Sequence, residues 1–243
     1  MKRTHTFLLL VAAAALTQAQ ESDTARRIVD RYLARLNYEA LRSDSMLYVE
    51  SRIFAPNSTD TVVMRRWHQE PNIDRVELWQ GGQLGKGMFT NGKGICMEYN
   101  AQRRKWALIS HETFLSQQMP YDFRSPLYKY HINGLELTYM GVLTYKGIPC
   151  QRVLVHTPNR YDRYYLFEAE SGLLFLIDEL ETVADGKASE ATHVDWRAVH
   201  EYQPFGQSLL PSIESYQDRQ GITIIKHTFQ YLPYDSSLFE EHR

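Results

Sequence analysis

The chain has 243 residues, of which 12% are aromatic, and it carries 27 basic and 29 acidic side chains. This near-balance of charge argues against nucleic-acid binding, which needs a basic surface, and against attachment to anionic lipid by charge alone. The length suits one all-β domain of ordinary size.

The N-terminus has the three parts of an export signal. Lys2 and Arg3 form a basic start, an apolar core follows, and Ala19 ends a stretch of small residues that suits a signal peptidase. The core is shorter than the roughly 20 residues that span a bilayer. We therefore expect a cleaved signal peptide at 1–19 and a mature domain at 20–243. No cysteine follows the core, which predicts an unlipidated protein in the periplasm of a Gram-negative cell. Cleavage removes two basic residues and leaves 25 against 29 acidic ones, a net charge of −4.

A single amphipathic helix is predicted directly after the signal. Ser22 or Asp23 is a suitable N-cap, and Asn37 is a suitable stop. Apolar residues recur between them at helical spacing: Ala25, Ile28, Val29, Tyr32, Leu33 and Leu36. One apolar stripe needs a surface to pack on, and the remaining pattern offers only sheet.

Short strands separated by turn residues make up most of the remaining chain. The predicted strands cover 46–54, 61–68, 73–79, 84–90, 93–99, 105–109, 135–145, 148–156, 163–168, 173–182, 191–202, 209–216 and 222–231. Asn91 and Gly92 are expected to form a two-residue hairpin turn, because both tolerate positive φ. The regular spacing, with no linker, predicts one domain.

The pattern changes between residues 111 and 130, where one or two short helices are expected at 111–118 and 121–130. Pro120 and Pro126 interrupt this segment, and its apolar residues include Phe114 and Phe123. The order of elements predicts a mainly β fold. It consists of a single strongly curved antiparallel sheet, a half-open barrel, with an N-terminal helix and a short helical lid.

Four segments carry a family resemblance: 70–77, 89–100, 164–173 and 235–239. In this order they resemble the Pro-then-Arg strand, the two hairpins and the closing Leu-Phe element of the LolA and LolB family of periplasmic lipoprotein carriers, the outer-membrane lipoprotein-sorting proteins. The resemblance implies a half-open sheet with a helical lid, whose concave face binds acyl chains. This chain has Cys96 and Met97 where a Trp is common in the family.

The predicted ligand site is an apolar cavity in the concave face. Its expected lining consists of Arg75, Leu78, Met97, Trp106, Phe114, Met119, Phe123 and Phe175. Arg75 is included because the resemblance aligns it with a strand arginine near the cavity of the carriers. Strand parity and the lid-like position of 111–130 indicate the others. Ordinary core packing is the alternative for each apolar member.

No catalytic or metal-binding pattern is found in the sequence. There is no G-x-S-x-G turn, and the histidines and cysteines lack the spacing of a metal site. We therefore expect a protein that is not an enzyme and needs neither cofactor nor metal. Cys96 and Cys150 are able to pair in an oxidising compartment. Each lies in an alternating apolar strand, which favours two buried thiols.

The leading hypothesis is a soluble periplasmic carrier that shields the acyl chains of a lipoprotein, or another lipid, during envelope trafficking. Burial would supply about 0.8 kcal/mol per methylene. The expected carrier is a monomer that binds no nucleic acid and exchanges its ligand with a membrane-bound donor or acceptor protein. An envelope lipid-sensing or signalling module on the same fold is the first alternative. An exported hydrolase is the second, and it would need a clustered acid–base or Ser–His set.

Overall fold

The computed structural model describes residues 20–41, 44–56, 58–70, 72–118, 124–157, 162–179, 196–218 and 220–240. The expected signal peptide and two expected site residues, Met119 and Phe123, lie outside these ranges. Within them, no helix combines the length and apolar character needed to cross a membrane.

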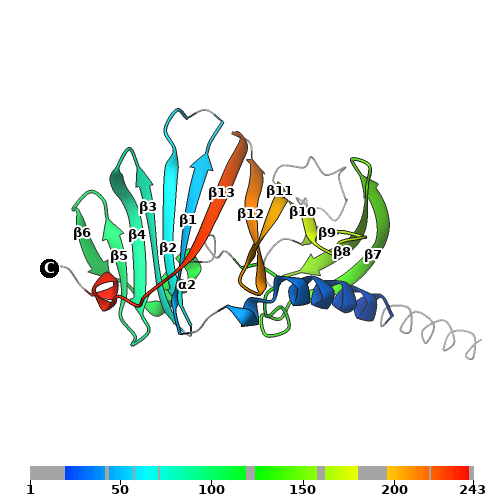
Figure 1. Cartoon of the computed structure of the whole chain (residues 1–243), viewed down its shortest axis with the longest axis horizontal. Helices are drawn as coiled ribbons and strands as arrows, with labels where there is room; N and C mark the ends of the chain where they lie inside the picture. Colours follow the sequence, from blue (N-terminus) through cyan, green and yellow to red (C-terminus); the bar gives the residue numbers. More distant parts are fainter. Residues whose placement is uncertain are drawn as a thin grey trace, which may run out of the picture. The chain divides into compact units, whose positions relative to one another are not determined.

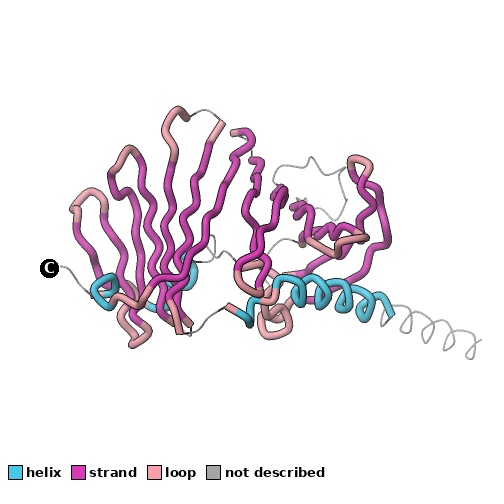
Figure 2. Tube along the Cα trace, viewed as in Figure 1, coloured by secondary structure: helices cyan, strands magenta, loops and turns pink. Residues whose placement is uncertain are grey.

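Strands dominate the fold, as Figures 1 and 2 show. The strands are β1 (Met46–Phe54), β2 (Val62–Gln69), β3 (Ile73–Gln80), β4 (Gln83–Asn91), β5 (Cys96–Asn100), β6 (Lys105–Leu108), β7 (Glu136–Tyr145), β8 (Ile148–His156), β9 (Arg163–Glu168), β10 (Leu174–Glu179), β11 (Trp196–Phe205), β12 (Ser208–Asp218) and β13 (Gly221–Leu232). The helical elements are the N-terminal helix at 20–36, η1 (Tyr38–Ala40), α2 (His111–Gln118) and η3 (Ser236–Phe239).

The described strands form one 13-stranded antiparallel sheet in the order β6-β5-β4-β3-β2-β1-β13-β12-β11-β10-β9-β8-β7. Consecutive strands are neighbours in the sheet, except that β6 and β7 lie at opposite edges, and β13 pairs with β1 as well as with β12 (Figure 1). Strands β6 and β7 are the two edges, so the described sheet is not closed into a barrel. This confirms the predicted open antiparallel sheet, preceded in the chain by one N-terminal helix.

Two compact units share the chain. The first comprises the chain up to Leu36, Pro126–Val199 and Gln217–Arg219. The second comprises Asn37–Ser125, His200–Tyr216 and Gln220–Arg243. Strands β1 to β6, α2, β13 and η3 belong to the second unit, in which the charged and polar groups described below lie.

In the first unit, the N-terminal helix packs through the predicted apolar stripe. Ala25, Ile28, Val29, Tyr32 and Leu36 are all buried. The ring of Tyr32 meets Phe167 edge-on, with 5.4 Å between the centroids. Burial of the larger aliphatic side chains, such as Ile28 and Leu36, contributes about 1.5–3 kcal/mol each.

The predicted start of this helix is wrong, whereas its predicted end is confirmed. Gln20 and Glu21 are already helical, so neither Ser22 nor Asp23 caps it. A residue that favours capping remains helical when the preceding backbone is helical too. The helix ends before Asn37, whose φ of 48° places it in the left-handed region.

The predicted two-residue turn at Asn91 and Gly92 is also wrong, because β5 begins only at Cys96. The side chain of Asn91 accepts hydrogen bonds from the backbone N–H groups of Lys93 (2.9 Å) and Ile95 (3.2 Å). Its backbone N–H donates to the carbonyl of Ile95 at 3.2 Å. The Asn91 side chain thus organises a longer loop, in which Gly92 has a φ of 72°.

One of the two expected short helices is confirmed as α2. Ser110 caps it by accepting a hydrogen bond from the Thr113 N–H at 3.1 Å. The described end of the second segment is not helical: residues 126–134 form turns. Pro126 cannot donate to a helical hydrogen bond, which accounts for the absence of a helix there.

Candidate functional site

The sheet of the second unit has two differently covered faces, because successive side chains of a strand point to opposite sides. The face on which α2 packs, here the helix face, has a buried apolar cluster: Met64, Val76, Met88, Cys96 and Phe114. The face on which η3 packs, here the C-terminal face, has another: Met46, Phe89, Met97 and Phe239.

On the helix face, Phe114 of α2 is the residue that joins the helix to the sheet. It is 2% exposed and packs within the cluster, with Ile53, Leu78 and Ile109 around it. Cys96 lies close to the start of α2, with its Sγ 3.6 Å from Nδ1 of His111. The apolar cluster is therefore covered by a helix of only eight residues.

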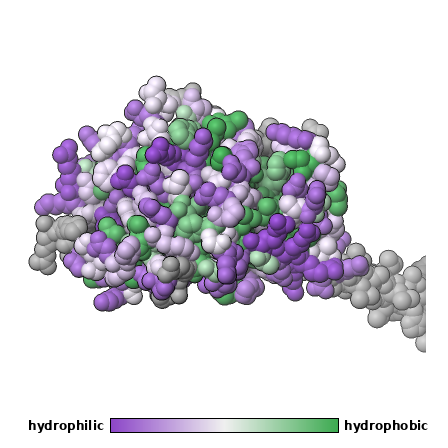
Figure 3. Space-filling view, viewed as in Figure 1, coloured by the Kyte–Doolittle hydropathy of each residue, from purple (hydrophilic) through white to green (hydrophobic). Residues whose placement is uncertain are grey.

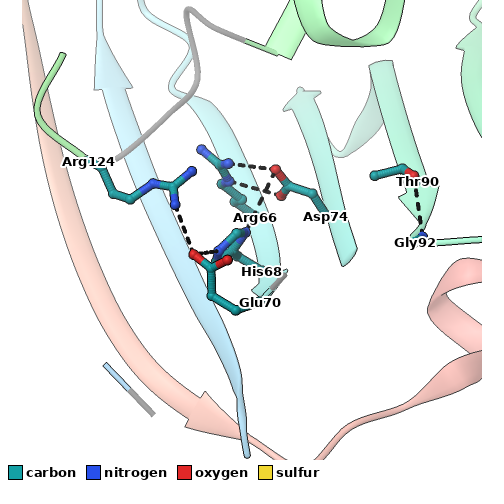
Figure 4. Close-up of polar contacts among 7 residues, drawn as sticks. All are labelled: Arg66, His68, Glu70, Asp74, Thr90, Gly92 and Arg124. Carbon is teal, nitrogen blue, oxygen red and sulfur yellow. Dashed lines mark hydrogen bonds and ion pairs between the residues drawn. The ribbon is translucent and has the colours of Figure 1, made fainter. Parts of the chain in front are cut away.

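The same face carries a buried ion pair next to the apolar cluster (Figure 4). Arg66 is fully buried and donates from Nε and Nη2 to the two carboxylate oxygens of Asp74, at 3.0 and 2.6 Å. The register places Arg66 opposite Val76, and Val76 opposite Met88. A charge this deep requires the bidentate geometry that Asp74 provides.

A second set of polar contacts extends from this pair (Figure 4). His68 lies with Nδ1 4.0 Å from Asp74 Oδ2 and Nε2 3.5 Å from Glu70 Oε1. Glu70 also accepts a hydrogen bond from Nη1 of Arg124 at 3.0 Å. Because Glu70 lies between β2 and β3, this contact ties Arg124 to the β2–β3 hairpin.

Further along the helix face, three polar residues from three neighbouring strands form a hydrogen-bonded row. Ser51 Oγ lies 2.7 Å from Nδ1 of His227, and Nε2 of His227 lies 3.2 Å from Oε2 of Glu214. Ser51 is fully buried and Glu214 is 4% exposed. This row, Ser51–His227–Glu214, is here called the polar row.

The expected cavity residues are distributed over both faces and both units. Leu78 and Phe114 lie on the helix face. Met97 and Trp106 belong to the cluster of the C-terminal face. Phe175 is half-buried in the first unit, 5.8 Å from the ring of Tyr145. The structure therefore brings Leu78 together with Phe114, and Met97 with Trp106.

Arg75 lies on the C-terminal face, where contacts with its own chain surround it. Its guanidinium lies 4.9 Å from the ring centroid of Trp106 and 5.7 Å from that of Phe89. Nε donates to Glu77 at 2.7 Å, and Nη1 donates to the carbonyl of Leu238 in η3. Arg75 thus holds the C-terminal element against the sheet.

Sequence reasoning missed the charged and polar residues of the helix face. One signal was present: Met64, Arg66 and His68 alternate along β2, so two charged or polar residues share a face with an apolar one. A polar residue at core parity is informative, because burial without a partner is costly. The pairing of Ser51 with His227 had no local signal, since 176 positions separate them.

The tyrosine and cysteine environments show how burial changes their acid–base behaviour. Burial, reinforced by the neighbouring Glu50 carboxylate, raises the pKa of Tyr48 to about 12. Burial also raises the pKa of Cys150, with a further contribution from Glu168. Both Cys96 and Cys150 are buried free thiols.

Among the described residues, no group of three or more His, Cys, Asp or Glu side chains is arranged to hold a metal ion.

Exposed hydrophobic side chains do not define an obvious binding surface in the view of Figure 3, where they are scattered among hydrophilic ones. Individually exposed residues such as Leu108, which is 72% exposed, are common on soluble proteins. We take the buried helix face as the candidate site because its apolar cluster adjoins buried charged and polar groups.

Comparison with solved structures identifies the fold. A LolA superfamily protein from Nitrosomonas europaea matches with a TM-score of 0.59 at 9% identity, over 89% of this chain and 97% of that one. A DUF1329 family protein from Desulfovibrio piger matches with a TM-score of 0.57 at 13% identity, over 89% and 97%. An outer membrane lipoprotein-sorting protein domain from Vibrio parahaemolyticus, described as putative, matches with a TM-score of 0.56 at 9% identity, over 90% and 97%.

These similarities show that the chain has a LolA-like fold, as the sequence resemblance implied. No protein-family model matches the sequence. No curated protein matches it either.

Proposed function

We propose that the protein is a carrier that binds an acyl chain or another lipid on the helix face of its second unit. The observation that supports this most is the apolar cluster of that face, which is covered by the eight residues of α2. A short helix joined to the cluster through Phe114 is a cover that would be able to lift and close over an apolar ligand, with Phe114 among the contacts of that ligand. The LolA-like fold, which a lipoprotein-sorting domain shares, supports the same conclusion.

The carrier would act by burial and not by catalysis. Each methylene that moves from water to the Met64–Val76–Met88 surface contributes about 0.8 kcal/mol. The export-like N-terminus supports a periplasmic location for the mature protein. Delivery would then require a membrane-bound donor or acceptor protein that competes for the ligand.

Nile red, an uncharged fluorescent probe, tests this function without any assumption about the polar part of the ligand. We expect the protein to bind it, and Phe114→Glu to weaken binding by about tenfold or more, since an unpaired charge in an apolar site is costly. The matched control is Leu108→Glu, which places the same charge on an exposed apolar residue and should leave binding unchanged.

Circular dichroism establishes that both variants are folded. The proposal fails if the wild-type protein does not bind Nile red, or if Phe114→Glu and the control bind it equally well. Native mass spectrometry of protein purified from the periplasm provides a second readout, with a co-purified lipid as the expected result.

A further inference from the structure

The carboxylate of the polar row constrains one proton of the row. A carboxylate only accepts hydrogen bonds, so Nε2 of His227 must carry the proton in the 3.2 Å contact with Glu214. The other ring nitrogen, Nδ1, lies 2.7 Å from the Ser51 hydroxyl and shares a hydrogen bond with it. The negative charge of the row therefore resides on Glu214.

A fourth polar group on this face has unused hydrogen-bonding capacity. Ser212 precedes Glu214 by two positions on β12, so both side chains point to the same face. Ser212 is 6% exposed, and within the described part of the chain its hydroxyl has no hydrogen-bond partner. Leaving a buried hydroxyl unsatisfied is costly, which indicates that a ligand group supplies the missing bond.

The polar row adjoins the apolar cluster in the register of the sheet. Ser51 lies opposite Met64 in the β1–β2 pair, and Met64 lies opposite Leu78 in the β2–β3 pair. Side chains directly opposite each other on one face are in contact range. A ligand with an apolar chain over Met64 and Leu78 would thus place its head group at Ser51, Glu214 and Ser212.

The charges on this face select the kind of head group. An anionic head group would meet the Glu214 carboxylate, with a like-charge repulsion that burial makes stronger. Arg66, on the adjacent register row opposite Val49, already forms two hydrogen bonds with Asp74. It is therefore not placed to compensate an anion at the polar row without breaking its own buried ion pair.

From these observations we infer that the polar row is a head-group subsite for hydrogen-bond donors, hydroxyl or ammonium groups, and that it discriminates against carboxylate and phosphate. This subsite deepens the proposed function and rests on it. Ser51 and Glu214 are buried, so a head group reaches the row only when the side chains around it move. Once there, it is shielded from water, where a hydrogen bond to a carboxylate is strong.

Displacement of Nile red by laurylamine, lauryl alcohol and laurate, which share one chain and differ in the head group, tests the subsite. We expect the amine and the alcohol to displace the probe at concentrations about tenfold lower than laurate. Glu214→Gln should remove most of this difference, because it should strengthen the binding of laurate and weaken the binding of laurylamine. Glu201→Gln, which removes an exposed carboxylate of β11, is the matched control and should preserve the difference.

Ser212→Ala provides a second variant that is expected to fold, since it removes a hydroxyl without a partner. We expect Ser212→Ala to weaken the binding of lauryl alcohol several-fold and to leave the binding of Nile red unchanged. Equal displacement by all three ligands, or unchanged preferences in both Glu214→Gln and Ser212→Ala, overturns the subsite alone. Failure of the wild-type protein to bind Nile red overturns the carrier function as well.

Discussion

The two faces of the second unit each bury an arginine, and the two arginines have different tasks. Arg66 on the helix face has its charge matched by Asp74 and lies beside an apolar cluster under a short helix. Arg75 on the C-terminal face is enclosed by aromatic rings, Glu77 and the backbone of η3. A buried arginine is thus not in itself a sign of a ligand site. What distinguishes the helix face is the polar row beside its apolar cluster, together with the Ser212 hydroxyl, which has no hydrogen-bond partner among the described residues.

The largest effect is expected from removing the partner of Arg66. Asp74→Ala removes the bidentate carboxylate partner of a fully buried guanidinium, and should lower the free energy of unfolding by about 3–5 kcal/mol. Glu70→Ala, at a carboxylate that is 45% exposed, should cost under about 1 kcal/mol. Urea unfolding measures both. Similar losses for the two variants would show that the Arg66–Asp74 pair is not the central charge of this face.

The next effect concerns the C-terminal face. Phe239→Ala removes a ring that is 4% exposed and lies 6.5 Å from Phe89. The loss should be about 3 kcal/mol, at the low end for a phenylalanine, because a terminal segment is able to detach locally. Urea unfolding gives the value, and limited proteolysis reports the detachment.

This variant also sharpens the comparison, since the two faces should respond independently. Nile red binding should stay unchanged in Phe239→Ala when it is measured on the folded protein. A loss of binding as large as that of Phe114→Glu would place the ligand on the C-terminal face instead.

The smallest effect is a change in the titration of Tyr48, whose hydroxyl donates to Glu50 at 3.1 Å. Glu50→Gln should lower the pKa from about 12 but leave it above the ordinary value of 10, because burial is the larger cause. The folded-state pKa is raised, so this contribution to stability is complete below about pH 10 and is lost as the pH rises through about 12. Phenolate absorbance follows the titration, and an unchanged pKa would contradict the role of Glu50.

Local patterns predicted the helix stripe from Ala25 to Leu36 and the bounds of β1, β8 and β9, because each depends on residues close in sequence. The turn after β4 was missed because the Asn91 side chain satisfies backbone groups that a two-residue turn would leave to the strands. Arg75 and Leu78 were assigned to one cavity, although a separation of three on a strand places them on opposite faces.

The polar row could not be predicted from the sequence, for a different reason. Its three members come from strands whose pairing is decided by the whole sheet, and no local spacing connects Ser51 with His227. The sequence therefore predicted the antiparallel sheet and the order of its elements. Which residues form the candidate site depended on the pairing register of the strands.

The place of β13 between β1 and β12 has a consequence for how the protein is made. The last strand of the chain is an interior strand of the sheet, and it pairs with the first along nine residues, from Met46 opposite Leu232 to Phe54 opposite Ile224. Until synthesis reaches that strand, β1 presents an unpaired edge, and the second unit cannot be completed. Folding must wait for a contact of very high sequence separation, which makes it slow. A nascent chain therefore stays incompletely folded until β13 has left the ribosome.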